Sequence, residues 1–189
     1  MNRKRKLVAE IKTESPFGFS SGKSWEELAE VAIHFGDIIS VHTDPKWGGS
    51  FDLIEKVRGM TDKPILAKGI HSNDEEVREA IKRGANYVLV VDRIPVISLR
   101  SVCWFEPSKT EQLSEFNFNI PTVVWNSRDL TTGTPKKESW EKMKSIYSGT
   151  VCQASYIKNL SDVKEDTDFY IVGENLLTVC EQIKKAETC

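Results

Sequence analysis

Two charged residues stand at the end of the first apolar run of this 189-residue chain. Glu10 and Lys12 are two residues apart, so in a β-strand their side chains lie on the same face. An acid and a base on a face that should be apolar are costly to bury unless they pair or meet a polar ligand. The segment therefore predicts a site for a polar molecule.

Three later apolar runs end in the same way. Lys68, Glu106 and Asn126 each close such a run, and Arg128 follows two residues after Asn126. Lysine can bind a phosphate or act as an acid, and a carboxylate can act as a base. Asparagine can hydrogen-bond an oxyanion, and arginine can hold a carboxylate through two hydrogen bonds. Each residue alone also fits an exposed strand end or turn, but together they favour an active site.

Apolar runs alternate with helical patterns along nearly the whole chain, which predicts a parallel sheet. We expect strands over residues 7–12, 37–42, 64–68, 86–91, 101–105, 120–125, 149–153 and 167–172. Helices fit residues 24–35, 50–60, 73–84, 108–116, 135–147, 160–165 and 173–186. Eight such units close into a barrel whose active site lies at the C-terminal ends of the strands. We therefore predict one domain, residues 1–189, with a shortened (β/α)8 (TIM) barrel of the α/β class.

The connection between the fourth and fifth strands is the shortest. Only Asp92 to Arg100 separate them, with Pro95 in the middle. A full crossover needs about ten or more residues. We expect the helix at this place to be missing or reduced to a turn.

The composition limits the classes of partner. The net charge of -2 implies no general attraction to nucleic acid. No apolar run approaches the roughly 20 residues that cross a bilayer, so no membrane partner is expected. The four cysteines lack a CxxC spacing and the three histidines lack a metal-ligand spacing, so we expect no metal. Reduced cysteines indicate a cytoplasmic location.

Two loops allow more than one interpretation. Gly173 lies at a strand-to-helix turn, where backbone N–H groups can face a phosphate, although the charge of Glu174 would repel that phosphate unless it points away. Trp47 lies in the loop after the second strand. It fits a lid over a planar substrate and, equally well, an ordinary loop residue packed on the barrel rim.

Taken in order, the segments resemble the indole-3-glycerol phosphate synthase family of tryptophan biosynthesis. The matching segments are Ala9–Lys12 with Ser15–Pro16, Ser40–Asp44 with Gly49–Ser50, Pro64–Lys68, Asn126–Leu130 and Ile171–Leu176. The resemblance implies a phosphate-binding barrel that acts on 1-(2-carboxyphenylamino)-1-deoxyribulose 5-phosphate. It implies closure of the indole ring with loss of carbon dioxide and water, and no metal or organic cofactor.

The resemblance also implies roles for the residues named above. Lys68 resembles the general acid at the ribulose carbonyl, and Glu106 the base in dehydration. Lys12 resembles the lysine that holds the substrate carboxylate and assists proton transfer, with Glu10 as its partner. Asn126 resembles the residue that orients the ribulose part.

Arg128 resembles the residue that orders the anthranilate end. Other residues fall where the family contacts substrate or phosphate: Ser15, Ser155, Gly173 and Glu174. The chain departs from the family where Ala154 replaces a glutamate and Tyr156 replaces a glycine. Gly69 and Ile70 replace an Asp-Phe pair, and the family's N-terminal extension has no counterpart ahead of the first strand.

Three alternatives stay open. The first is a non-catalytic barrel of the same ancestry that binds a phosphorylated ligand or a partner, which the lost glutamate and glycine favour. The second is phosphoribosylanthranilate isomerase, which would carry a cysteine where this chain has Lys12. The third is a purely structural α/β domain, which leaves the charges at the strand ends unexplained. A homodimer, or association with other enzymes of tryptophan biosynthesis, is also open.

Overall fold

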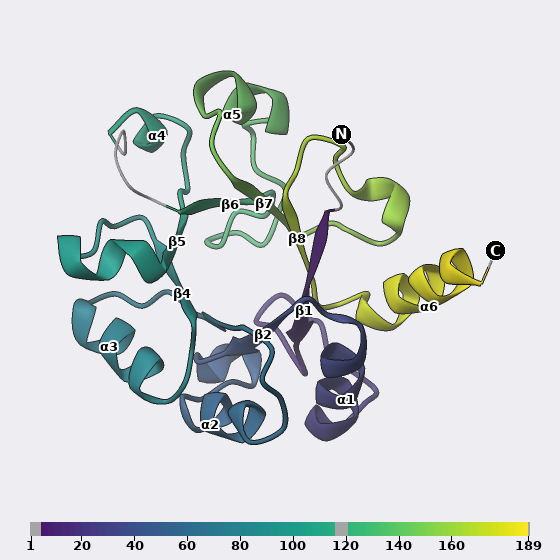
Figure 1. Cartoon of the computed structure of the whole chain (residues 1–189). Helices are drawn as coiled ribbons and strands as arrows, with labels where there is room; N and C mark the ends of the chain where they lie inside the picture. The colour runs from purple at the N-terminus through teal and green to yellow at the C-terminus, as the bar shows by residue number, and fades with distance from the viewer. Residues whose placement is uncertain (1–4, 116–120, 189) are drawn as a thin grey trace.

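The computed structural model describes residues 5–115 and 121–188. Its eight parallel strands form one closed ring in chain order, which confirms the predicted (β/α)8 barrel (Figure 1). The strands are β1 (Lys6–Ile11), β2 (Ile38–His42), β3 (Ile65–Lys68), β4 (Tyr87–Val91), β5 (Cys103–Glu106), β6 (Thr122–Asn126), β7 (Val151–Ala154) and β8 (Phe169–Val172). The predicted strand ranges agree with these bounds to within two residues, and residue 120 lies outside the described part.

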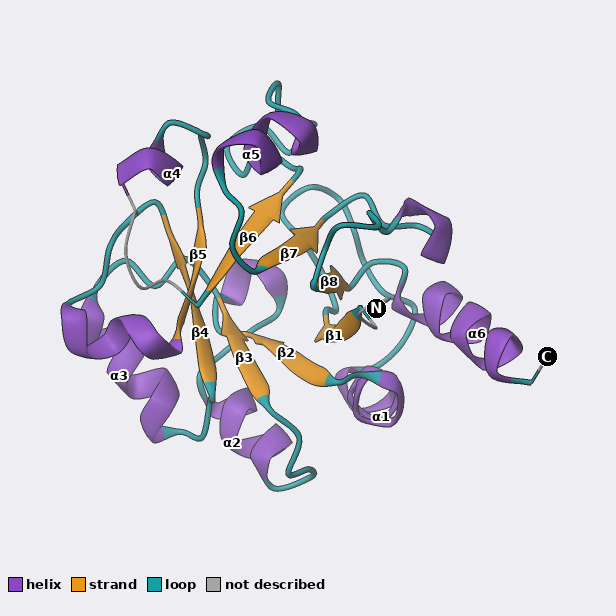
Figure 2. Cartoon of the chain, turned by 45° about the horizontal axis from the view of Figure 1, so that its top comes forward, coloured by secondary structure: helices purple, strands orange, loops and turns teal. Residues whose placement is uncertain are grey.

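The helices surround the ring of strands, as Figure 1 and the turned view in Figure 2 show. The α-helices are α1 (Trp25–Phe35), α2 (Asp52–Arg58), α3 (Asp74–Lys82), α4 (Gln112–Glu115), α5 (Trp140–Ile146) and α6 (Leu176–Glu187). The short 3-10 helices are η1 (Pro45–Trp47), η2 (Ile97–Val102) and η3 (Leu160–Asp162). None of the described helices is long and apolar enough to span a bilayer.

Helix α3 shows how local sequence fixes these elements. The Asn73 side chain accepts a hydrogen bond from the backbone N–H of Glu76 and caps the first turn, which is rich in acidic residues. Val77 and Ala80 are buried against the barrel. The helix ends just before Gly84, whose φ of 106° suits a glycine after a helix.

Several helices are shorter than predicted, and the one expected over residues 160–165 is only the 3-10 helix η3. The helix expected over residues 135–147 begins only at Trp140, because the Ser139 side chain accepts the N–H of Lys142 and caps it there. The preceding segment is held to the loop after β6, where the N–H of Lys136 donates to Ser127. The helix expected over residues 108–116 shortens to α4, and residue 116 lies outside the described part.

The connection from β4 to β5, expected to lack a full helix, carries the 3-10 helix η2. Only Leu99 of η2 is buried, and Ile97 is 76% exposed. This connection therefore covers its strands with less apolar surface than a complete helix would bury.

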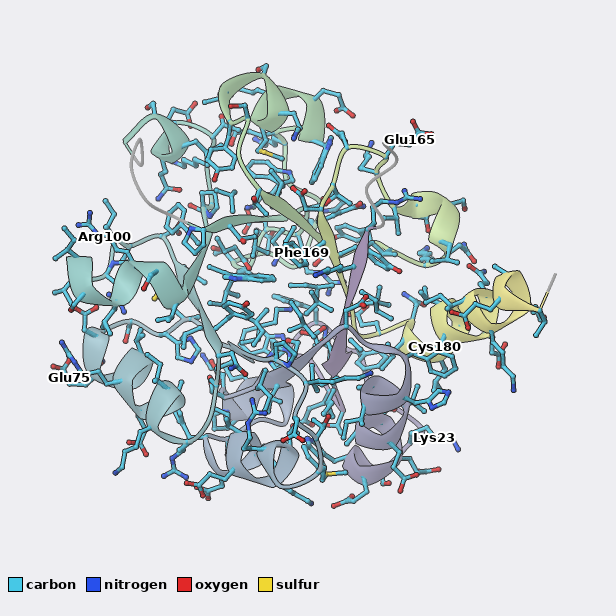
Figure 3. The ribbon with its side chains drawn as sticks, viewed as in Figure 1. Lys23, Glu75, Arg100, Glu165, Phe169 and Cys180 are labelled. Atoms are coloured by element: carbon cyan, nitrogen blue, oxygen red, sulfur yellow. The ribbon has the colours of Figure 1, made fainter. Side chains whose placement is uncertain are left out.

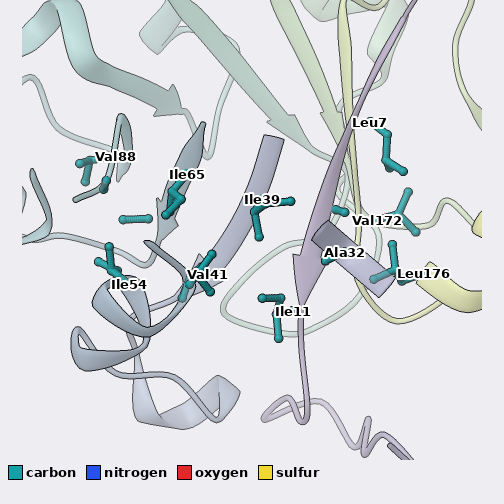
Figure 4. Close-up of a cluster of buried hydrophobic side chains, with 14 of the residues drawn as sticks. Leu7, Ile11, Ala32, Ile39, Val41, Ile54, Ile65, Val88, Val172 and Leu176 are labelled. Carbon is teal, nitrogen blue, oxygen red and sulfur yellow. The ribbon is translucent and has the colours of Figure 1, made fainter. Parts of the chain in front are cut away.

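Alternation along the strands separates the two sides of the barrel wall. In β1, Leu7 and Ala9 face the helices, whereas Val8 faces the interior. Figure 4 shows side chains of the outer cluster between the strands and α1 and α6. The inner cluster gathers one or two residues from each strand, and the rings of Trp104 and Phe169 lie 5.0 Å apart between centroids. Figure 3 labels Phe169 near the centre of the ring of strands.

Candidate active site

The alternation that fills the barrel interior also brings polar residues to its mouth. Glu106 lies two residues beyond the interior Trp104, and Lys68 lies two residues beyond the interior Leu66. Because the C-terminal ends of parallel strands meet at one rim, these side chains share a cavity. Its lining includes Lys12, Lys68, Glu106, Asn126, Arg128 and Ser155.

Glu10 forms a buried cluster with Lys68 and His42. Lys68 Nζ donates to Glu10 Oε1 at 2.5 Å, and His42 Nε2 lies 2.7 Å from the same oxygen. Burial disfavours the Glu10 carboxylate, but Lys68 and His42 hold its pKa well below the usual range. Burial likewise disfavours the Lys68 ammonium, yet Glu10 and Glu106 raise its pKa, so Lys68 carries a proton at neutral pH.

Lys12 pairs with Glu174 and not with the predicted partner Glu10. Lys12 Nζ lies 2.7 Å from Glu174 Oε1. The reason is the position of Lys12 along the barrel axis. Lys12 lies one residue beyond the end of β1, and β1 pairs with β8, whose following loop carries Glu174. Burial disfavours the Glu174 carboxylate, but Lys12 and Arg128 lower its pKa. Glu174 is therefore an ionised partner of two cations rather than an isolated negative charge.

Arg128 lies against two aromatic rings. Its guanidinium carbon is 5.4 Å from the ring centroid of Phe17 and 5.2 Å from that of Tyr156. Its Nη2 lies 3.2 Å from the Glu174 carboxylate, and its backbone N–H donates to Asn126 Oδ1 at 3.0 Å. Its buried Nε has no hydrogen-bond partner among the described residues. This arrangement holds the guanidinium plane at the cavity wall, where it can bind a carboxylate.

A chain of hydrogen bonds orients Glu106. Asn126 Nδ2 donates to Glu106 Oε1 at 2.9 Å, and Ser155 Oγ donates to Asn126 Oδ1 at 2.6 Å. Glu106 is only 2% exposed. Burial raises the pKa of Glu106, and Lys68 and Asn126 oppose that rise. A carboxylate with a raised pKa is a stronger base than an exposed one and suits proton transfer.

The loops after β7 and β8 border a second cavity next to the first. Its lining includes Lys12, Lys68, Ser155, Tyr156, Gly173 and Asn175. Ser155 and Tyr156 adopt φ values of 66° and 55°, in the left-handed region that favours glycine. The Tyr156 hydroxyl donates to the carbonyl of Gly133 at 3.2 Å, which joins the loops after β6 and β7.

Position 173 requires a glycine because its backbone lies against the Glu10 side chain. A Cβ at this position would overlap the Glu10 carboxylate. The absence of a side chain therefore lets the buried carboxylate reach Lys68 and His42. This requirement differs from the predicted one, in which the glycine exposed backbone N–H groups to a phosphate, and it does not test that prediction.

Ser15 is placed differently from the other predicted residues. Its Oγ accepts the backbone N–H groups of Phe17 and Phe19 at 3.3 and 3.4 Å. It forms a turn and does not border either cavity among the described residues. A contact of Ser15 with substrate stays a prediction.

His42 and Trp47 both border the first cavity. The sequence patterns gave His42 no role, whereas Trp47 was predicted to be either a lid over the substrate or a residue packed on the barrel rim. The two-residue step from Ile38 through Ser40 to His42 is the signal that could have placed the imidazole at the mouth. Residues 5–115 and 121–188 contain no group of three or more His, Cys, Asp or Glu side chains that could hold a metal ion.

The closed ring of eight strands, with lysines, carboxylates and an arginine at one end, defines a (β/α)8-barrel protein with a charged cavity at its mouth. A solved structure supports the fold: the crystal structure of KGPDC from Streptococcus mutans superposes with a TM-score of 0.66 at 14% identity, over 96% of both chains.

The sequence comparisons identify the family. The profile of indole-3-glycerol phosphate synthase matches residues 1–97. The enzyme of that name from Sulfurisphaera tokodaii is 31% identical over 96% of this chain and 82% of its own length. The chain belongs to the indole-3-glycerol phosphate synthase family.

The matches to two other curated relatives cover only part of those proteins. The synthase of Halalkalibacterium halodurans is 28% identical, and the match spans 77% of this chain but 63% of that protein. The synthase of Thermococcus kodakarensis is 34% identical over 48% of this chain and 42% of that protein. Each of these two matches spans less than two thirds of the relative's length.

Proposed function

We propose that this protein is an indole-3-glycerol phosphate synthase, a decarboxylating carbon–carbon lyase. Its substrate would be 1-(2-carboxyphenylamino)-1-deoxyribulose 5-phosphate, and its products indole-3-glycerol phosphate, carbon dioxide and water. The observation that carries the proposal is the single cavity bordered by Lys12, Lys68 and Glu106, in a chain of this family.

Ring closure needs an acid at the ribulose carbonyl. As the aromatic carbon that bears the carboxylate attacks the carbonyl carbon, Lys68 would give its proton to the carbonyl oxygen. The raised pKa of Lys68 supports this role, because the group then enters the reaction protonated. The carboxylate then leaves as carbon dioxide, and its bonding electrons return to the ring.

Dehydration needs a base and a route for the departing hydroxyl. Glu106 would remove a proton from the ribulose carbon that is bonded to the nitrogen, while the new hydroxyl would accept a proton from Lys12 and leave as water. Asn126 would orient both Glu106 and the ribulose part. The hydrogen bond of 2.9 Å between Asn126 and Glu106 supports this assignment. Strand ends on one rigid rim hold these groups in place, which lowers the entropic cost of reaction.

The two cations at the rim would bind the anionic substrate. Lys12 and Arg128 would hold the carboxylate of the anthranilate end, and both already share Glu174. The cavity beside Ser155 and Gly173 would receive the phosphate. Contact of Ser15 with the substrate, a homodimer, an association with another enzyme of tryptophan biosynthesis and a cytoplasmic location stay predictions.

The test is turnover of the carboxyphenylamino-deoxyribulose phosphate, followed by indole fluorescence. Lys68→Ala should abolish product formation, and Glu106→Gln should lower kcat about 100-fold or more. Matched controls are Lys185→Ala and Glu187→Gln, which change exposed residues of α6 and should keep wild-type rates.

Two outcomes would count against the proposal. Turnover that persists in both Lys68→Ala and Glu106→Gln would refute the mechanism. A wild-type protein that binds the substrate but forms no product would support the non-catalytic barrel instead.

A further inference from the structure

His42 is a buried titratable residue to which the proposed mechanism gives no role. It ends β2 and is 4% exposed. In the barrel wall its register partner is Lys68 of β3. Its Nε2 lies 2.7 Å from Glu10 Oε1, the oxygen that accepts the Lys68 ammonium at 2.5 Å. One carboxylate oxygen thus faces two groups that can donate to it.

The imidazole is held in this position by its neighbours. The indole ring of Trp47 in η1 lies parallel to it, at an interplanar angle of 1° and 5.8 Å between ring centroids. His42 and Trp47 both border the first cavity. Both ring nitrogens of His42 are buried, and neither makes a hydrogen bond of regular geometry with the described residues. The 2.7 Å approach of Nε2 to Glu10 Oε1 is therefore the polar contact of the ring.

The charges around His42 decide its protonation state. Burial lowers the pKa of His42, Glu10 of β1 opposes this, and Lys68 of β3 and Lys12 beyond β1 lower it further. The ring is therefore neutral at neutral pH. A neutral imidazole carries one N–H, and the carboxylate oxygen beside Nε2 favours the tautomer with that proton on Nε2.

We propose that His42 is a positioning residue: across the 2.7 Å contact its ring turns its Nε2–H onto Glu10 Oε1 and so limits how firmly Glu10 holds the Lys68 ammonium. This rests on the proposed function, in which Lys68 is the acid of ring closure. A second donor stabilises the Glu10 carboxylate and so weakens its attraction for the Lys68 proton. Without His42, Glu10 would hold the Lys68 proton more tightly, and the transfer to the carbonyl oxygen would be slower.

The kinetic test compares His42→Leu, which removes the donor, with His42→Gln, which keeps an N–H donor that does not titrate. We expect His42→Leu to lower kcat on the order of tenfold. The alkaline limb of the kcat–pH profile should move to higher pH, because Lys68 then loses its proton at higher pH. His42→Gln should keep kcat within about threefold and leave that limb in place. His34→Leu, the same change at an exposed position of α1, is the control and should match wild type.

A spectroscopic test does not depend on turnover. The 15N resonances of the His42 ring, assigned by their loss in His42→Gln, should report the neutral Nε2–H tautomer at about pH 7. In Glu10→Gln the pKa of His42 should fall further, because Glu10 opposes its lowering. A neutral Nδ1–H tautomer, or a charged ring at that pH, would overturn the proposal.

The two proposals fail in different ways. Wild-type turnover together with wild-type kcat and an unmoved alkaline limb in His42→Leu would overturn the role of His42 alone. No wild-type turnover would overturn the proposed function, and the ring resonances would still decide whether His42 donates to Glu10.

Discussion

Asn126 donates its side-chain amide to the carboxylate of Glu106 over 2.9 Å, and both side chains are buried at the ends of adjacent strands. This hydrogen bond fixes the direction of the carboxylate and lowers the pKa of Glu106 against the effect of burial. Glu106 therefore depends on Asn126 both for its orientation and for its strength as a base.

Replacing Asn126 tests this dependence. In Asn126→Ala we expect kcat to fall about 10- to 100-fold. The acid limb of the kcat–pH profile should move to higher pH, because the pKa of Glu106 rises when the hydrogen bond is lost. Ser155→Ala, which removes only the donor to Asn126, should show a smaller change in the same direction. An acid limb that stays in place in Asn126→Ala would contradict this reading of the pair.

Glu174 holds two cations that the substrate is expected to use. In Glu174→Gln, Lys12 and Arg128 lose their shared counterion, so the free energy of unfolding should fall by roughly 1–3 kcal/mol. The affinity for the anionic substrate should rise, on the order of tenfold, because the internal carboxylate no longer competes for the same cations.

Urea unfolding and calorimetric titration of the Lys68→Ala background would measure these two effects, since that background is expected not to turn the substrate over. Glu187→Gln in the same background is the matched control at an exposed carboxylate. Weaker substrate binding in Glu174→Gln would show that Glu174 helps to bind the substrate rather than competing with it.

A side chain at Gly173 should disturb the Glu10 cluster. The added methyl group of Gly173→Ala would overlap the Glu10 carboxylate, which is held by Lys68 and cannot move away freely. We expect a loss of roughly 1–3 kcal/mol in unfolding free energy. Gly22→Ala is the control, because a Cβ there meets no atom within 4 Å. Equal unfolding midpoints for the two variants would argue against a steric reason for Gly173.

The order of elements and the strand-end residues could be predicted from the sequence because they depend on local signals. Alternation along a strand places Lys68 and Glu106 two residues beyond buried interior residues. Capping residues such as Asn73 mark where helices begin. The ion pairs could not be predicted in this way. Lys12 meets Glu174 because the closing of the barrel brings β1 beside β8.

His42 is a second residue whose partners could not be predicted from its own segment. Its residue type and its spacing from the other histidines carry no metal signal, and its importance arises only when register sets it opposite Lys68. Barrel closure and register are properties of the whole chain. The side-chain partners at the mouth are therefore beyond what single segments can specify.

Two buried histidines should make the folded protein less stable on the acid side of neutrality. Burial lowers the pKa of both His42 and His71, so both stay neutral when folded. In the unfolded chain each titrates near its ordinary value of about 6.5. Below that pH the unfolded state binds more protons than the folded state, so stability falls as the pH drops, by at most about 1.4 kcal/mol per pH unit for each histidine.

Urea unfolding at about pH 7, 6 and 5 would measure this slope before most carboxylates titrate. Glu106, whose pKa is raised, works in the opposite direction in the lower part of this range, because the folded state then holds the extra proton. The double variant His42→Gln with His71→Gln should show a flatter dependence on pH than wild type, whatever its absolute stability. His34→Gln, at an exposed histidine, should keep the wild-type slope. An equal slope in the double variant would mean that these two rings take up protons at the same pH in the folded and in the unfolded protein.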